Sequence, residues 1–139
     1  MRRLITIAAA IFVTSVGSLY GQTAASTATL GTVRIPQAVM ADGKPLPAGT
    51  YQVRLTTTSP APVVGQSPAE TRWIEFLQRG TVAGREVATV VADADMPAIQ
   101  DMPKRGGAVR VETLKGGDYL RVWMHHSGSH YLIHLPKGS

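Results

Sequence analysis

The four histidines of this 139-residue chain lie close together near its end, at His125, His126, His130 and His134. If Ser127-Gly128-Ser129 forms a three-residue turn, His126 faces His130 across a hairpin, with Cβ atoms about 5 Å apart. Two imidazoles at that distance suit Zn, Cu or Ni. However, a turn that differs by one residue would put them on opposite faces, and no neighbouring carboxylate is evident in sequence. We therefore predict solvated or hydrogen-bonded hairpin histidines, with no metal ligand and no cofactor.

The segment from Asp93 to Gly107 contains aspartates and two Asp-Met-Pro repeats, at residues 95–97 and 101–103. Alternate aspartates can bind calcium, but the glycine and the closing glutamate of an EF-hand loop are missing. The methionine thioethers would suit copper beside the histidines only if this segment folded over the hairpin. We interpret the segment as a solvated loop.

An aromatic and arginine patch is the candidate binding site. Strand alternation places Tyr119, Arg121 and Trp123 on one face, and Tyr131 is expected beside them. Such a patch can stack sugar rings or bind a partner protein, here a carbohydrate or protein at the cell envelope. The same side chains also fit a second layer of core, and the sequence leaves both interpretations open.

Catalytic motifs are weak in this sequence. No strand-to-helix nucleophile elbow precedes the serines, and a hydrolase would need Glu75, Glu86, Glu112 or an aspartate to meet in one cleft. Glu112 alternates with valines, as expected for a solvated strand face. We predict that the protein is not an enzyme, with a hydrolase as the alternative.

The elements that must position these residues are short strands. Val-, Ile-, Thr- and Tyr-rich runs alternate with Gly, Pro, Asp and Ser clusters, and no window has sustained helical spacing. The expected strands are Thr32–Ile35, Thr50–Thr56, Arg72–Arg79, Arg85–Ala92, Ala108–Leu114, Tyr119–His125 and Tyr131–Leu135. A short helix is expected at Met96–Gln100, and residues 108–135 form a three-stranded meander. The pattern predicts one antiparallel β-sandwich or partly open barrel of seven to eight strands.

The segment Leu46-Pro47-Ala48-Gly49-Thr50-Tyr51 resembles a motif of small bacterial exported β-sandwich proteins and prealbumin-like modules, where a Pro-x-Gly turn leads into a strand. The run from Tyr119 to Trp123 with that from Tyr131 to Leu135 is similar to their closing hairpin. The resemblance implies architecture only, and it carries over no catalytic or binding residue.

The N-terminus has the pattern of a secretion signal. Arg2 and Arg3 precede the apolar run Leu4–Val16, and small residues follow it. The run is too short for a bilayer span of about 20 residues. We predict a signal peptide at residues 1–25, cleaved between about residues 21 and 25, and a single β domain at residues 26–139. The mature protein is expected in the periplasm or outside the cell, without a membrane span.

Composition limits the function further. The chain contains no cysteine, so thiol catalysis, thiolate metal sites, a lipobox and disulfides are excluded. Loss of Arg2 and Arg3 lowers the formal net charge from +5 to +3, and the remaining basic residues are scattered, which argues against nucleic-acid binding. The sequence therefore predicts a non-catalytic exported module with a structural or a ligand- or protein-binding role, and a histidine-hairpin metal-binding protein as a further alternative.

Overall fold

A computed structural model describes residues 28–61, 64–65, 67, 70–97, 102–103 and 108–139. The predicted signal peptide lies outside these residues. In chain order the elements are β1 (Thr29–Ile35), β2 (Val39–Ala41), β3 (Lys44–Leu46), β4 (Gly49–Leu55), β5 (Thr71–Gln78), β6 (Thr81–Ala92), the short 3-10 helix η2 (Asp93–Asp95), β7 (Val109–Thr113), β8 (Tyr119–His126) and β9 (Ser129–Pro136). Within the described residues, no helix is long and apolar enough to cross a bilayer.

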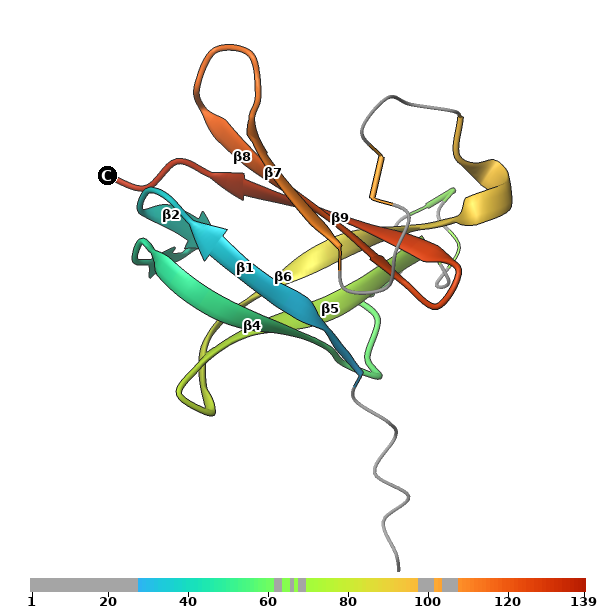
Figure 1. The fold of residues 1–139 in the computed structure, drawn as a ribbon, viewed down its shortest axis with the longest axis horizontal. Helices are drawn as coiled ribbons and strands as arrows, with labels where there is room; N and C mark the ends of the chain where they lie inside the picture. Colours follow the sequence, from blue (N-terminus) through green and yellow to red (C-terminus); the bar gives the residue numbers. More distant parts are fainter. Residues whose placement is uncertain (1–27, 62–63, 66, 68–69, 98–101, 104–107) are drawn as a thin grey trace, which may run out of the picture.

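Seven antiparallel strands form one sheet in the order β1-β4-β5-β6-β9-β8-β7. The sheet curves until β1 lies against β7 and β8, so it is nearly closed (Figure 1). This confirms the prediction of an antiparallel all-β fold, in its partly open barrel form. A small second sheet of β2 and β3, which was not predicted, lies next to β6 and β9.

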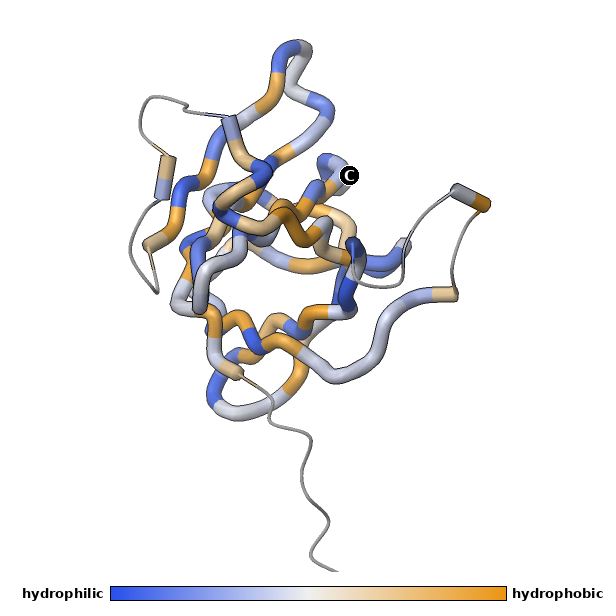
Figure 2. Tube along the Cα trace, turned by 90° about the vertical axis from the view of Figure 1, so that its right-hand side faces the viewer, coloured by the Kyte–Doolittle hydropathy of each residue, from blue (hydrophilic) through white to orange (hydrophobic). Residues whose placement is uncertain are grey.

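The interior is filled by alternate side chains of the strands. β5 contributes Ile74 and Phe76 from one side, and β8 contributes Leu120, Val122 and Met124 from the other, all at most 1% exposed. The strands surround this core as a ring when the molecule is turned by 90° (Figure 2). Period-two alternation therefore determines which face of each strand is buried.

Tyr51 on β4 stabilises the turn that precedes this strand. The Tyr51 hydroxyl donates a hydrogen bond to the Pro47 carbonyl at 2.6 Å, and the ring packs edge-on against Phe76 with centroids 6.1 Å apart. Burial raises the pKa of Tyr51, so the hydroxyl keeps the proton that this bond requires. The Pro-x-Gly-Thr-Tyr motif is thus a local device that directs the chain into β4.

Of two expectations for local elements, one changes and one is confirmed. A helix was predicted at Met96–Gln100, but the helical turn is η2, at residues 93–95, and Met96 and Pro97 follow it without helical structure. The remainder of the predicted helix lies outside the described residues. The meander of β7, β8 and β9 is confirmed by the pairing of β7 with β8 and of β8 with β9.

Candidate functional site

The turn between β8 and β9 sets the register of the histidines. It consists of two residues, Ser127 with φ of 46° and Gly128 with φ of 78°, and two positive φ values match the twist of a tight hairpin. His125 consequently pairs with His130, and His126 pairs with Ser129. The expectation that His126 faces His130 is wrong, because the turn is one residue shorter than the predicted Ser127-Gly128-Ser129.

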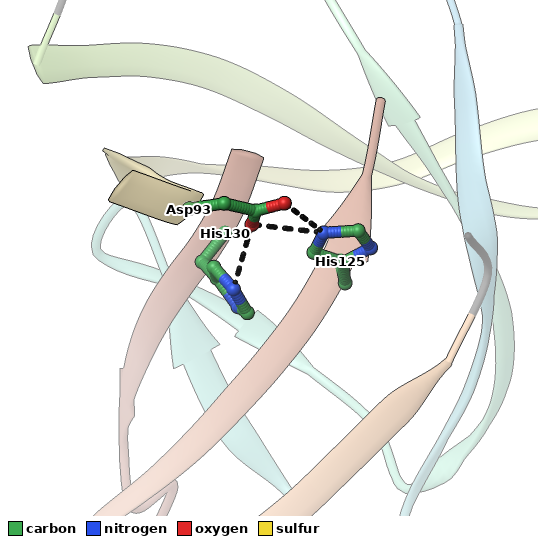
Figure 3. Close-up of side chains that lie close together, drawn as sticks. All are labelled: Asp93, His125 and His130. Atoms are coloured by element: carbon green, nitrogen blue, oxygen red, sulfur yellow. Dashed lines mark hydrogen bonds and ion pairs between the residues drawn. The ribbon is translucent and has the colours of Figure 1, made fainter. Parts of the chain in front are cut away.

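A carboxylate joins the paired histidines. Asp93, at the start of η2, points toward His125 on β8 and His130 on β9 (Figure 3). His125 Nε2 lies 2.9 and 3.1 Å from the two Asp93 oxygens, and His130 Nε2 lies 3.0 Å from Oδ1. One nitrogen or oxygen atom of each residue lies within 4.8 Å of the others. We call these three residues the Asp93 cluster.

The sheet order brings Asp93 to this position. β6 pairs with β9, and its last residue, Ala92, lies opposite Ser129. The Asp93 backbone N–H then donates to the Gly128 carbonyl at 3.0 Å, which ties the start of η2 to the hairpin turn. Two segments that are distant in sequence, the end of β6 and the β8–β9 hairpin, are thereby joined through backbone hydrogen bonds.

Hydrogen-bonding partners determine where the imidazole protons lie. The indole Nε1–H of Trp123 donates to His130 Nδ1 at 2.8 Å. Since an indole N–H can only donate, Nδ1 must accept, and the proton of neutral His130 is on Nε2. His125 Nε2 also faces two carboxylate oxygens and must carry a proton. Both rings therefore donate to Asp93 through Nε2–H.

The other nitrogen of His125 has different surroundings. Nδ1 is buried and has no hydrogen-bond partner among the described residues, and it is turned away from Asp93 (Figure 3). A buried acceptor without a partner is unfavourable in a folded protein. Within the described part of the chain, the Asp93 cluster is therefore not a fully satisfied structural network.

The cluster borders a small pocket of about 220 Å³, lined by Asp93, Met102, His125 and His130. His125 is 8% exposed and His130 is 2% exposed, whereas the Asp93 side chain is 51% exposed and connects the pocket to solvent. Met102 belongs to the second Asp-Met-Pro repeat, so part of the Asp93–Gly107 segment does lie over the hairpin. Asp101 lies outside the described residues.

Burial affects the charge of the cluster. It lowers the pKa of His130, the charge of His125 lowers this pKa further, and Asp93 partly offsets both effects. The neutral state agrees with the hydrogen bond from Trp123, because a doubly protonated ring has no acceptor for the indole N–H. The proton of neutral His130 therefore stays on Nε2, which faces Asp93.

We expect the metal-free protein to lose stability as pH falls from 7.5 to 5.5. The native state resists protonation of His130, while the unfolded chain takes up the proton near pH 6.5, so stability is retained above that pH and lost below it. This one group contributes a slope of at most about 1.4 kcal/mol per pH unit. Urea denaturation at both pH values measures it. His130→Gln should have a smaller slope than the wild type, and equal slopes in the two proteins would contradict the assignment.

The remaining histidines lie outside the cluster. His126 follows His125 on β8 and pairs with Ser129, while His134 pairs with Arg121 further along the hairpin. Partial burial and the charge of Arg121 lower the pKa of His134. Among the described residues, only His125 and His130 share a carboxylate in a group that could hold a metal ion.

The four residues of the predicted patch do not form one exposed surface. Trp123 is 2% exposed, and Tyr131 is 7% exposed and belongs to the core on the opposite face, next to Met124. Tyr119 is 46% exposed, and the Arg121 guanidinium is paired with Glu112. Trp123 and Tyr131 therefore have core positions, on the two faces of the sheet.

The glutamates considered for hydrolysis are each engaged separately. Glu75 pairs with Arg54, Glu112 pairs with Arg121 and Arg110, and Glu86 accepts the backbone N–H groups of residues 42 and 87. Glu86 also lies opposite Ile74 on the inner face, whereas Glu75 is on the outer face. Neither described pocket is lined by two carboxylates.

Asp93 is the member of the site that sequence reasoning did not connect with the histidines. Its only local signal is its position directly after a strand, in a segment interpreted as a solvated loop.

No family model, curated protein or solved structure matches this chain.

Proposed function

We propose that this chain is an exported, non-catalytic β-barrel module that binds a late first-row divalent metal ion through Asp93, His125 and His130. The observation that carries the proposal is the convergence of three ligand atoms within 4.8 Å at a pocket open to solvent through Asp93. The export part rests on the charged and apolar N-terminal pattern of the sequence.

The spacing of the cluster suits a small ion. Two ligands of a tetrahedral ion with bonds of about 2.0–2.1 Å lie about 3.3–3.4 Å apart. The nearest nitrogen–oxygen distances are 2.9 Å for His125 and 3.0 Å for His130. Each of these two nitrogen–oxygen distances needs to lengthen by only about 0.3–0.5 Å to admit the ion, which would replace the Nε2 protons now facing the carboxylate.

The donor set favours zinc, copper or nickel. Two imidazoles and one carboxylate suit these ions, and the pocket contains no thiolate. Met102 lines the same pocket and adds a polarisable thioether, which favours copper among the three.

Calorimetric titration of the chelator-treated protein with Zn²⁺, Cu²⁺ and Ni²⁺ tests the proposal. We expect a 1:1 complex with a Kd in the micromolar range or tighter for at least one ion. His125→Ala should weaken binding by at least about 100-fold, because loss of a ligand exceeds the 10- to 100-fold effect of an outer-shell partner. In the wild type, free metal at 100 times Kd should raise the free energy of unfolding by about 2.7 kcal/mol.

His126→Ala is the matched control. This residue adjoins His125 on the same strand but lies outside the Asp93 cluster, so the variant should bind like the wild type. A wild-type Kd no tighter than millimolar would overturn the proposal. Equal loss of metal affinity in His126→Ala and His125→Ala would also overturn it, because nonspecific binding to several hairpin histidines would then account for the affinity.

A further inference from the structure

Trp123 is hydrogen-bonded to one of the two ring nitrogens of His130. The indole Nε1 and His130 Nδ1 are 2.8 Å apart, and both side chains are 2% exposed, so water does not compete for this bond. The rings meet edge-on, with centroids 5.7 Å apart. Because the indole can only donate, the bond selects the neutral tautomer with hydrogen on Nε2. In that tautomer the nitrogen facing Asp93 has no lone pair to offer.

The two histidines differ in what metal binding requires of them. A metal ligand needs an unprotonated Nε2, so each ring must move its proton to Nδ1. Each ring then gives up its Nε2–H bond to Asp93, but His125 breaks no bond at Nδ1, because that atom has no partner among the described residues. In His130, the arriving proton would meet the Trp123 N–H. His130 must therefore lose one hydrogen bond more than His125, the one at Nδ1, to become a ligand.

A second route would remove the Nε2 proton altogether and leave an imidazolate that still accepts from Trp123. A neutral imidazole gives up this proton only in strongly basic solution, so at neutral pH the loss of one hydrogen bond is the smaller cost. Metal binding is therefore expected to break the contact between Trp123 and His130 and to retain a neutral ring.

We propose that Trp123 is a positioning residue that holds His130 in the non-ligating tautomer and thereby weakens metal binding at the Asp93 cluster. This inference rests on the proposed metal-binding function. It assigns Trp123 a role opposite to that of the usual outer-shell partner, which accepts the N–H of a ligating histidine and strengthens binding. The metal-free site is a closed, hydrogen-bonded state that competes with the ion, so the bound ion is easier to release.

The test compares Trp123→Phe with Trp73→Phe by calorimetric titration with Zn²⁺. Phenylalanine retains an aromatic ring but cannot donate, so we expect Zn²⁺ to bind about tenfold tighter to Trp123→Phe than to the wild type. Trp73 lies on β5 and stacks with Arg85, 4.3 Å from the guanidinium carbon to the ring centroid. It therefore controls for loss of an indole elsewhere, and its variant should bind like the wild type.

A spectroscopic measurement on the wild type supports or overturns the inference even if Trp123→Phe does not fold. Proton–nitrogen correlation spectra of the His130 ring should show hydrogen on Nε2 without metal and on Nδ1 at saturating Zn²⁺. Hydrogen on Nδ1 in the metal-free protein would overturn the role of Trp123. Binding that is no tighter in Trp123→Phe, with wild-type binding intact, would do the same. Absence of binding in both proteins would instead overturn the proposed function.

Discussion

Replacement of Trp123 by alanine is expected to lower the free energy of unfolding by about 3–5 kcal/mol, the usual cost of truncating a large buried aromatic side chain. Trp123 is 2% exposed, so its removal leaves a cavity. It also removes the donor for His130 Nδ1, a buried acceptor that would lose its partner. Urea denaturation of the metal-free protein measures the change.

Tyr119→Ala is the control for this prediction. Tyr119 lies on the same strand and the same face as Trp123, but it is 46% exposed, so we expect a change within about 0.5 kcal/mol. If both variants lost the same small amount of stability, Trp123 would be an exposed side chain in solution, and the structural basis of the His130 tautomer would be lost with it.

Truncation of Phe76 to alanine should destabilise the protein by a similar amount, about 3–5 kcal/mol, for a different reason. Phe76 is completely buried in the barrel interior and packs edge-on against Tyr51. The Tyr51 hydroxyl also stabilises the turn before β4, so the loss of stability should extend to that turn. Thermal and urea unfolding of the metal-free protein measure the effect.

Val82→Ala provides the comparison for Phe76→Ala. Val82 lies on the neighbouring strand β6 and is 47% exposed, so its truncation should change stability by no more than about 0.5 kcal/mol. A loss below about 1 kcal/mol in Phe76→Ala would contradict a close-packed barrel interior, because buried phenylalanines rarely have so small an effect.

The hairpin histidines show how closely a site depends on one local feature. From the sequence, the cross-strand partner of His130 is either His125 or His126. The length of the turn between β8 and β9 decides which of the two it is. Ser127 and Gly128 both adopt positive φ, which selects the two-residue turn and pairs His130 with His125. A serine is an uncommon residue at positive φ, so the sequence alone did not reveal this turn.

The β2–β3 hairpin was missed for a related reason. Asp42 and Gly43 have φ values of 49° and 71°, and Asp-Gly between short apolar runs is a typical tight-turn signal. Each strand has only three residues, which is too short to show alternation, and Pro45 weakens the strand pattern. The burial of Val39, Ala41 and Leu46 comes from packing against the larger sheet.

The sequence by itself determined the antiparallel β fold and the inward face of the best-defined strands, because alternation and turn residues are properties of neighbouring positions. It placed Leu120, Val122 and Met124 on one face and Trp123 on the other. Only the tertiary structure decided that Trp123 is buried on the outer face as well, and that Asp93 meets His125 and His130. The contact of Asp93 with the two histidines depends on the order β6-β9-β8, which brings Asp93 next to residues more than thirty positions further along the chain. No local pattern encodes that order, because it results from the way in which all the strands share one core.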